Sequence, residues 1–342
     1  MKSRGPHLEY SHAAGRRIWT DRLQMLAILK NIWRNLPLRG RTALYRTLGW
    51  SGIPYVLGYA AGYRDCFDAR NFAGELVHLH DEYRAADAEI RTRLEARIAE
   101  VLDALVLPNG VKKTTYPMRH AYAISAFLEV TEFSSGQSIR VLDVPSSTGI
   151  SSLTTLQLLR DRFRIDRYVL GDLAHRINWD RDRQCIFDEE GNLLQVKTGS
   201  RFFSIYQGHA SGDVFPPLAK IWLYPIHRKA ARLVRRYTPD PNKSMQAVPL
   251  VHPEVERMMV DGVIAVERMN VFEQGQENFD LVLSFNLLQR NYFPASEIQH
   301  GLDALASRLH EGGYLITGNT ESFAIMRKKG NVLVEVQRKG TF

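Results

Sequence analysis

The chain has 342 residues, of which 44% are hydrophobic and 24% are charged, which is ordinary for a soluble globular protein. This composition excludes a mostly disordered chain, and the length suits one α/β domain with a substantial additional part. The two cysteines, Cys66 and Cys185, lack the spacing of a zinc site or a disulfide framework. We therefore expect free thiols, no metal and a cytoplasmic location, which the polar start MKSRGPHLEY also favours.

The net charge of +8 is unevenly distributed along the chain. Residues 1–50 carry ten Lys or Arg residues against two acidic residues, so this segment contains the entire excess. Such a basic arm indicates an anionic partner, such as a membrane surface or an acidic protein, while a solvated basic helix would explain it equally well. Nucleic acid is an unlikely partner, because the chain has no interleaved aromatic and basic motif for single strands.

The apolar spacing over residues 16–106 is that of helices, which predicts an N-terminal helical domain over residues 1–111. One apolar stripe, residues 90–105, ends just before the stop signal at residues 108–110. The uncharged stretch 47–63 contains four Gly and a Pro, so we expect it to pack within this domain rather than to span a membrane.

From residue 139 onward, strands alternate with helices, which is typical of a parallel sheet covered on both faces. The expected strands are residues 139–144, 167–173, 262–272, 278–288 and 312–319, and the expected helices are residues 151–163 and 295–309. A final hairpin is expected at Lys329-Gly330-Asn331, which is a strong turn signal. The fold class predicted is therefore α/β, a doubly wound, seven-stranded Rossmann-like sheet with five parallel strands and an antiparallel pair.

The stretch IRVLDVPSSTGI, residues 139–150, carries the main functional signal. In such a sheet a ligand binds beyond the carboxyl ends of the central strands, where the acid ending the second strand meets a ribose. Asp172 follows Gly149 by 23 residues, which is close to the expected spacing. Pro145 and Ser147 remove the G-x-G that approaches a pyrophosphate. This combination favours a nucleoside cofactor without phosphates, for which S-adenosyl-L-methionine is the obvious candidate.

Several stretches, in this order and spacing, resemble the class I S-adenosylmethionine-dependent methyltransferases. VLDVPSSTG looks like their first motif. KKTTYPMRHAYAISAFL, NFDLVLSFNLLQRNYF and LHEGGYLITGNTES are similar to three segments of the chemotaxis-receptor branch, although Phe285 replaces its Arg and Pro117-Met118 depart from its aromatic segment. The resemblance implies a methyltransferase domain over residues 112–342, with the unmatched insertion 174–261 as a substrate lid or recognition element.

The resemblance and the strand pattern together imply a set of cofactor-binding residues. Asp143 would fix the loop and face the methionine amino group, and Arg119 would meet the methionine carboxylate. Asp172 would accept hydrogen bonds from the ribose, and Asn270 would bind the adenine amino group. The complete set is Arg119, Asp143, Pro145, Ser147, Thr148, Gly149, Asp172, Leu173, Asn270, Val271 and Asn286. Plain alternatives remain open: a loop-capping Asp, a helix-entry Gly, a turn Asn and an exposed Arg.

Methyl transfer is an in-line displacement, so the enzyme mainly aligns a nucleophile with the methyl group and excludes water. Asn286 and Tyr292 follow the fourth strand and are the candidate catalytic residues. Other possible bases, among which the sequence does not choose, are His120, Tyr206, His209 and His300. The expected acceptor is an oxygen or nitrogen of a small molecule. A protein carboxylate (glutamate) methyltransferase and a non-catalytic S-adenosylmethionine-binding module are the alternatives.

Within the insertion, residues 216–237 combine apolar residues with six Lys or Arg residues and no acid. This pattern predicts a lid or a surface-seeking helix, while a helix packed on its own domain is an equal alternative. Together with residues 1–50, the segment would attract an anionic membrane surface or an acidic protein, which would place the chain at the membrane periphery. A hairpin is also expected at Glu190-Gly191-Asn192.

Overall fold

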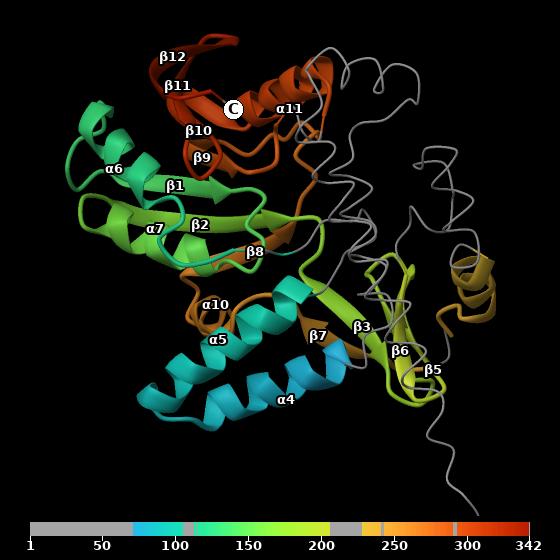
Figure 1. Ribbon diagram of the computed structural model, residues 1–342. Helices are drawn as coiled ribbons and strands as arrows, with labels where there is room; N and C mark the ends of the chain where they lie inside the picture. The colour runs from blue at the N-terminus through green and yellow to red at the C-terminus, as the bar shows by residue number, and fades with distance from the viewer. Residues whose placement is uncertain are drawn as a thin grey trace, which may run out of the picture.

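The computed structural model describes residues 71–104, 113, 115–205, 228–240, 243–289 and 293–341. The predictions for the basic arm 1–50, the stretch 47–63, Tyr206, His209 and Tyr292 lie outside the described residues. Figure 1 shows a large twisted sheet with helices on its faces and, beside it, a smaller sheet with two long helices.

The main sheet has seven strands: β1 (Ser138–Asp143), β2 (Arg164–Asp172), β8 (Ile264–Arg268), β9 (Phe279–Phe285), β10 (Leu309–Gly318), β11 (Phe323–Lys329) and β12 (Val332–Lys339). Their order is β12-β11-β10-β9-β1-β2-β8 (Figure 1). Strands β8, β2, β1, β9 and β10 pair in parallel, whereas β11 is antiparallel to both of its neighbours. The predicted α/β sheet is confirmed, including the final hairpin, which turns at Gly330 with φ of 58°.

Helices cover both faces of this sheet: α6 (Ala121–Val130), α7 (Ile150–Arg160), α10 (Pro253–Val260) and α11 (Ala295–Ser307). Buried residues of α6, α7 and α10 share one core with Leu281 and Leu283 of β9. The residue between them, Val282, belongs to a second core that contains Leu305 of α11. Because successive side chains of a strand point to opposite faces, the nearly continuous apolar runs of the central strands supply both cores.

The insertion forms a second sheet, which is antiparallel: β3 (Arg176–Asp180), β4 (Cys185–Phe187), β5 (Leu193–Thr198), β6 (Arg201–Ser204) and β7 (Gln246–Pro249). The strand order is β6-β5-β4-β3-β7. The predicted hairpin at Glu190-Gly191-Asn192 is confirmed, since β4 pairs with β5 across it. Asp188 stabilises the turn, because its Oδ1 accepts hydrogen bonds from the backbone nitrogens of Glu190 (2.9 Å) and Asn192 (2.7 Å).

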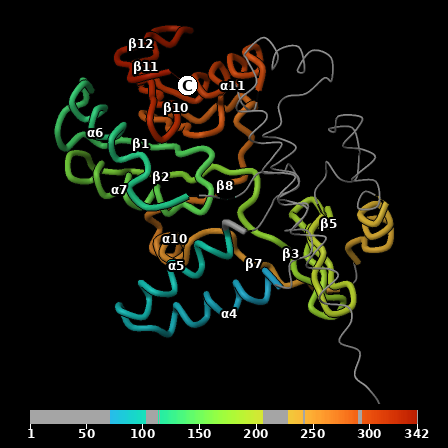
Figure 2. Tube along the Cα trace, viewed as in Figure 1, coloured from blue at the N-terminus to red at the C-terminus, as the bar shows by residue number. Residues whose placement is uncertain are grey.

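Helices α4 (Phe72–Ala85) and α5 (Ala88–Ala104) come before α6 in the chain, and both pack on the inserted sheet. Figure 2 follows the chain through these helices. Ile98, Val101 and Leu102 of α5 are buried there together with strand residues such as Ile177. Ile90, predicted to belong to the same apolar stripe, is instead 46% exposed near the start of the helix. The helices and the insertion therefore share one core.

Residues 228–236, the described helical part of the basic segment 216–237, lie on another face of the inserted sheet. Ala230 is buried against strand residues such as Phe203, and Leu233 and Val234 pack on the same cluster. Four arginines of this helix are exposed: Arg228, Arg232, Arg235 and Arg236. In this part the apolar side chains are thus used for packing within the protein. Among the described residues, no helix has the length and apolar character that crossing a membrane requires.

Candidate functional site

Apart from Arg119, the described site residues that the sequence predicts lie at the ends of β1, β2, β8 and β9 or after them. These strands run in parallel and therefore end at the same edge of the sheet. From β1 the chain continues to β2 and β8 on one side, and later to β9 and β10 on the other (Figure 1). The strand order thus reverses between β1 and β9. In open α/β sheets such a switch point is where ligands bind.

The loop between β1 and α7 is held against β2 by its backbone. Ser146 N donates to the carbonyl oxygen of Gly171 (2.9 Å), and Gly149 N donates to that of Ser146 (2.9 Å). Ser147 adopts a left-handed conformation with φ of 57°, and Val144-Pro145 is a cis peptide. The hydroxyl oxygens of Ser146 and Ser147 are buried without a hydrogen-bond partner. Since buried polar atoms are normally paired, these two hydroxyls mark the loop as a place where a ligand could bind.

Gly149 begins α7 with φ of 78°, a conformation that favours glycine. A Cβ atom there would lie 2.8 Å from Cγ2 of Val255 and 2.9 Å from Cδ1 of Leu170. The missing side chain therefore lets the loop approach α10 and β2 closely. This packing supports the helix-entry role that the sequence left open for Gly149.

Asp143 ends β1 and is buried. Its Oδ2 accepts hydrogen bonds from the hydroxyls of Ser152 on α7 (2.6 Å) and Tyr168 on β2 (3.4 Å). Burial raises the pKa of this carboxyl to about 6, and the nearby charge of Asp172 adds to the rise, while the two hydroxyls oppose it. The carboxylate thus ties the loop to the helix and strand beside it.

Asp172 ends β2 and is bonded directly to the loop. Its Oδ2 accepts a hydrogen bond from Ser147 N (2.8 Å), and its Oδ1 accepts one from Ala174 N (3.2 Å). The ammonium of Lys113 lies 3.2 Å from the same Oδ1 and also donates to the carbonyl oxygen of Ser147 (3.1 Å). Sequence reasoning missed Lys113. The available signal was its place, since Lys113 is the second residue of the stretch KKTTYPMRHAYAISAFL.

The residues after Lys113 lie across the same loop and the start of α7. The hydroxyl of Thr115 is 3.1 Å from that of Ser151, and Met118 N donates to the hydroxyl of Thr154 (3.4 Å). Arg119 Nε donates to the hydroxyl of Thr320 beyond the end of β10 (3.3 Å). Arg119 therefore lies beside the carboxyl end of β10.

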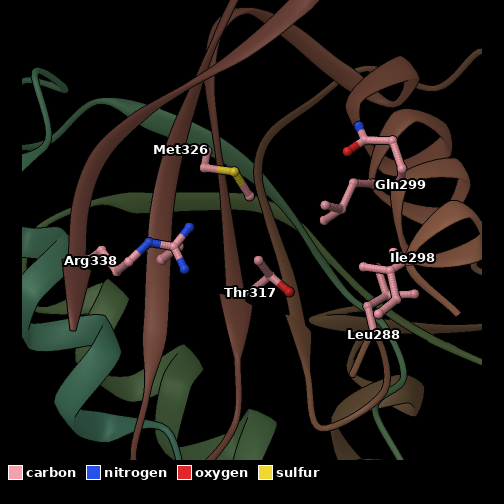
Figure 3. A pocket seen from close by; sticks show the side chains of 9 residues that line it. Leu288, Ile298, Gln299, Thr317, Met326 and Arg338 are labelled. Carbon is pink, nitrogen blue, oxygen red and sulfur yellow. The ribbon is translucent and has the colours of Figure 1, made fainter. Parts of the chain in front are cut away.

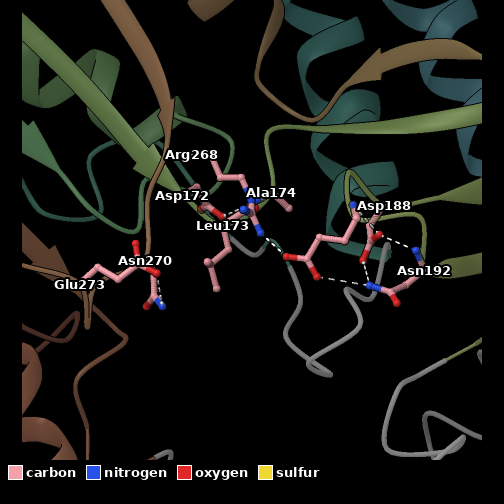
Figure 4. Close-up of polar contacts among 9 residues, drawn as sticks. Asp172, Leu173, Ala174, Asp188, Asn192, Arg268, Asn270 and Glu273 are labelled. Atoms are coloured by element: carbon pink, nitrogen blue, oxygen red, sulfur yellow. Dashed lines mark hydrogen bonds and ion pairs between the residues drawn. The ribbon is translucent and has the colours of Figure 1, made fainter.

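Asn270 and its neighbours follow β8 (Figure 4). The side chain of Asn270 accepts a hydrogen bond from Phe272 N (3.1 Å) and donates to Glu273 Oε1 (3.2 Å), as a turn asparagine does. Val271 is buried in the core next to α11. Leu173, by contrast, is 46% exposed directly after Asp172 and offers an apolar surface at this edge.

Asn286 follows β9 in a left-handed conformation with φ of 61°, and its backbone nitrogen donates to the carbonyl oxygen of Gly318 (2.7 Å). The residue before it, Phe285, stacks on the ring of His120 with the ring centroids 4.0 Å apart. Burial lowers the pKa of His120 to about 3, and the charge of Arg119 adds to this. His120 is therefore a neutral, weakly basic ring that packs on Phe285.

Two hollows in the surface are formed by other parts of the chain. One of about 200 Å³ lies between α11 and strands β10 to β12, lined by residues such as Leu288, Thr317 and Met326 (Figure 3). The other, of about 630 Å³, lies on the inserted sheet beside Trp179 and Lys243. The loop after β1 lines neither of them. Within the described ranges, no group of three or more His, Cys, Asp or Glu residues could hold a metal ion.

Neither a family model nor a curated protein matches this chain. Solved structures similar to it include the N-methyltransferase NodS from Bradyrhizobium japonicum WM9 in complex with S-adenosyl-L-homocysteine (10% identity, 64% of this chain and 71% of that chain covered, TM-score 0.27). Others are CalS10, an amino pentose methyltransferase from Micromonospora echinaspora (11%, 63% and 64%, 0.28), and an O-methyltransferase family protein from Burkholderia thailandensis (12%, 66% and 41%, 0.28). At these TM-scores, the function has to be argued from the site itself.

Proposed function

We propose that this chain is an S-adenosyl-L-methionine-dependent methyltransferase that transfers a methyl group to an oxygen or nitrogen of a small-molecule acceptor. The observation that carries the proposal is the 2.8 Å hydrogen bond from Ser147 N to Asp172 Oδ2. It joins the loop after the first strand to the acid that ends the second strand, beside the switch point of the sheet. A doubly wound sheet binds the ribose of a nucleoside ligand at this position.

Three features of the edge fit this cofactor. Pro145 and Ser147 occupy the loop without the glycines that a pyrophosphate requires. The buried hydroxyls of Ser146 and Ser147 have no hydrogen-bond partner in the protein, and a bound ligand could supply one. Leu173 exposes an apolar side chain immediately after the ribose-binding acid. These features favour a nucleoside whose polar tail carries no phosphate.

The predicted residues that the structure describes then have proposed roles. Asp172 binds the ribose, while Leu173, Asn270 and Val271 border the adenine. Arg119 binds the methionine carboxylate. Asp143 fixes the loop that lies beside the methionine part of the cofactor. The loop residues that pass along the cofactor are Pro145, Ser147, Thr148 and Gly149. When bound, the cofactor supplies an activated methyl group. The residues of the chain align the acceptor and exclude water, with the amide of Asn286 at the end of β9 oriented toward the reacting groups.

Isothermal titration calorimetry of the full chain tests the cofactor assignment. We expect binding of S-adenosyl-L-methionine and S-adenosyl-L-homocysteine and no binding of NAD, and preferential binding of NAD would overturn the proposal. Asp172→Asn should weaken binding about tenfold or more, because the ribose loses charge-assisted hydrogen bonds. Asp182→Asn is the control, since Asp182 is an exposed acid that pairs with Lys243 at 3.3 Å on the inserted sheet.

The acceptor class is tested with radiolabelled S-adenosyl-L-methionine. Label that moves into small molecules supports the proposal, whereas base-labile label on added proteins would indicate the carboxylate methyltransferase instead. A non-catalytic binding module is the second candidate. It predicts cofactor binding without transfer to any acceptor.

A further inference from the structure

The ion pair between Lys113 and Asp172 occupies the carboxylate on which the proposed function depends. The two side chains are only 2% and 9% exposed, and the ammonium lies 3.2 Å from Asp172 Oδ1. Asp172 also accepts hydrogen bonds from Ser147 N and Ala174 N. The carboxylate that is predicted to bind the ribose is therefore already satisfied by the protein.

The present donors to Asp172 leave too few acceptor positions for the two hydroxyls of a ribose. An ionised carboxylate offers about four lone-pair positions, of which Asp172 uses two for backbone N–H groups and one for the ammonium. A ribose presents two hydroxyl donors, so it needs two positions on Asp172. Because the side chain of Asp172 is almost enclosed, the hydroxyls also need the volume that the Lys113 side chain fills.

We infer that Lys113 is an internal competitor of the cofactor, whose ammonium must leave Asp172 before the ribose hydroxyls can bind there. This inference rests on the proposed function. In the exchange, one ribose hydroxyl takes the position that the ammonium leaves and the other takes the free position, while the two backbone N–H groups continue to hold the carboxylate. The lysine is suited to this movement, because its ammonium is strongly hydrated and its stem has four flexible carbons.

The competition has a measurable consequence for binding. The form that accepts the cofactor is a minor state, and the apparent dissociation constant is the intrinsic constant divided by the population of that state. Removing the lysine makes this state the major one. The dissociation constant of Lys113→Ala for S-adenosyl-L-homocysteine should therefore fall about tenfold or more, since minor states are populated at about 0.1–10%.

The experiment measures affinity and association rate for S-adenosyl-L-homocysteine by calorimetry and stopped-flow fluorescence on the full chain. Lys113→Ala should bind more tightly, mainly through faster association, and Lys113→Arg, which keeps the cation, should not. Lys243→Ala is the matched control, because Lys243 pairs with Asp182 at 3.3 Å on the exposed surface. Lys113→Gln, which retains a donor but no charge, replaces Lys113→Ala if the latter fails to fold.

A structure of the wild-type chain with S-adenosyl-L-homocysteine gives a test without mutation. Lys113 Nζ displaced from Asp172 and two ribose oxygens in its place would support the inference. The same lysine still bonded to Asp172 in the complex would overturn it, as would unchanged or weaker binding by a folded Lys113→Ala. If neither the wild-type chain nor any variant binds the ligand, the proposed function itself is wrong. Binding by the variant alone would support both.

Discussion

Substitution of Gly149 by alanine would show how closely the loop after β1 is fitted to the core. The new Cβ would lie 2.8 Å from Val255 Cγ2 and 2.9 Å from Leu170 Cδ1, and both neighbours are buried. It would also place a non-glycine residue at φ of 78°. Two separate costs in the free energy of unfolding are therefore expected, one from the backbone and one from packing.

The left-handed backbone costs a non-glycine residue about 1–2 kcal/mol. Overpacking of a filled core adds about 1–3 kcal/mol, so Gly149→Ala should lower the free energy of unfolding by about 2–5 kcal/mol. The chain provides a matched control in Gly136, which has the same φ of 78° and no atom within 4 Å of an added Cβ. Gly136→Ala should therefore show the backbone cost alone, about 1–2 kcal/mol.

Urea unfolding followed by circular dichroism measures both variants against the wild-type chain. The difference between the two substitutions is the packing cost, because the two glycines share the same φ of 78°. Equal losses of stability in the two variants would refute the reasoning. They would mean that Val255 and Leu170 move aside freely, and that the loop is not fixed by its contact with the core.

Three further predictions concern pH and charge. Burial raises the pKa of Asp143 from 3.8 to about 6, so the folded state binds this proton more tightly than the unfolded state does. The free energy of unfolding should therefore fall by about 3 kcal/mol as the pH rises through this range. Urea unfolding of Asp143→Asn at several pH values should show that this fall is absent. A pH profile of stability equal to that of the wild-type chain would contradict the prediction. Burial lowers the pKa of His120 from 6.5 to about 3, so the folded state favours the neutral ring. The contribution of this ring to the free energy of unfolding is present above pH 6.5 and is lost as the pH falls toward 3. His120→Phe, which keeps a ring against Phe285, should flatten the acid side of the stability curve, and an equally steep loss in the variant would refute this. Finally, the chain should sediment with anionic vesicles at low salt, and Arg232→Glu/Arg235→Glu/Arg236→Glu should weaken this without changing cofactor affinity. No sedimentation, or sedimentation unchanged in the triple variant, would leave the insertion without a membrane role.

The sequence by itself determined the main sheet, because its signals are local. Apolar runs of strand length, each followed by helical spacing, fixed the alternation from residue 139 onward. The glycine at position 330 fixed the final hairpin, since its left-handed φ of 58° suits glycine in a turn. The loop 144–149 and Asp172 could be placed at one edge for the same reason, because parallel strands bring their carboxyl ends together.

Only the tertiary structure decided what these residues contact. The inserted sheet has strands as short as three residues, too short for a periodic signal, and only its hairpin turn at Gly191 was visible in the sequence. The packing of α4 and α5 on that sheet, and the bond between Lys113 and Asp172, join segments that are far apart in the chain. The energy of a buried ion pair depends on which surfaces exclude water around it, and this is settled only when the chain has folded.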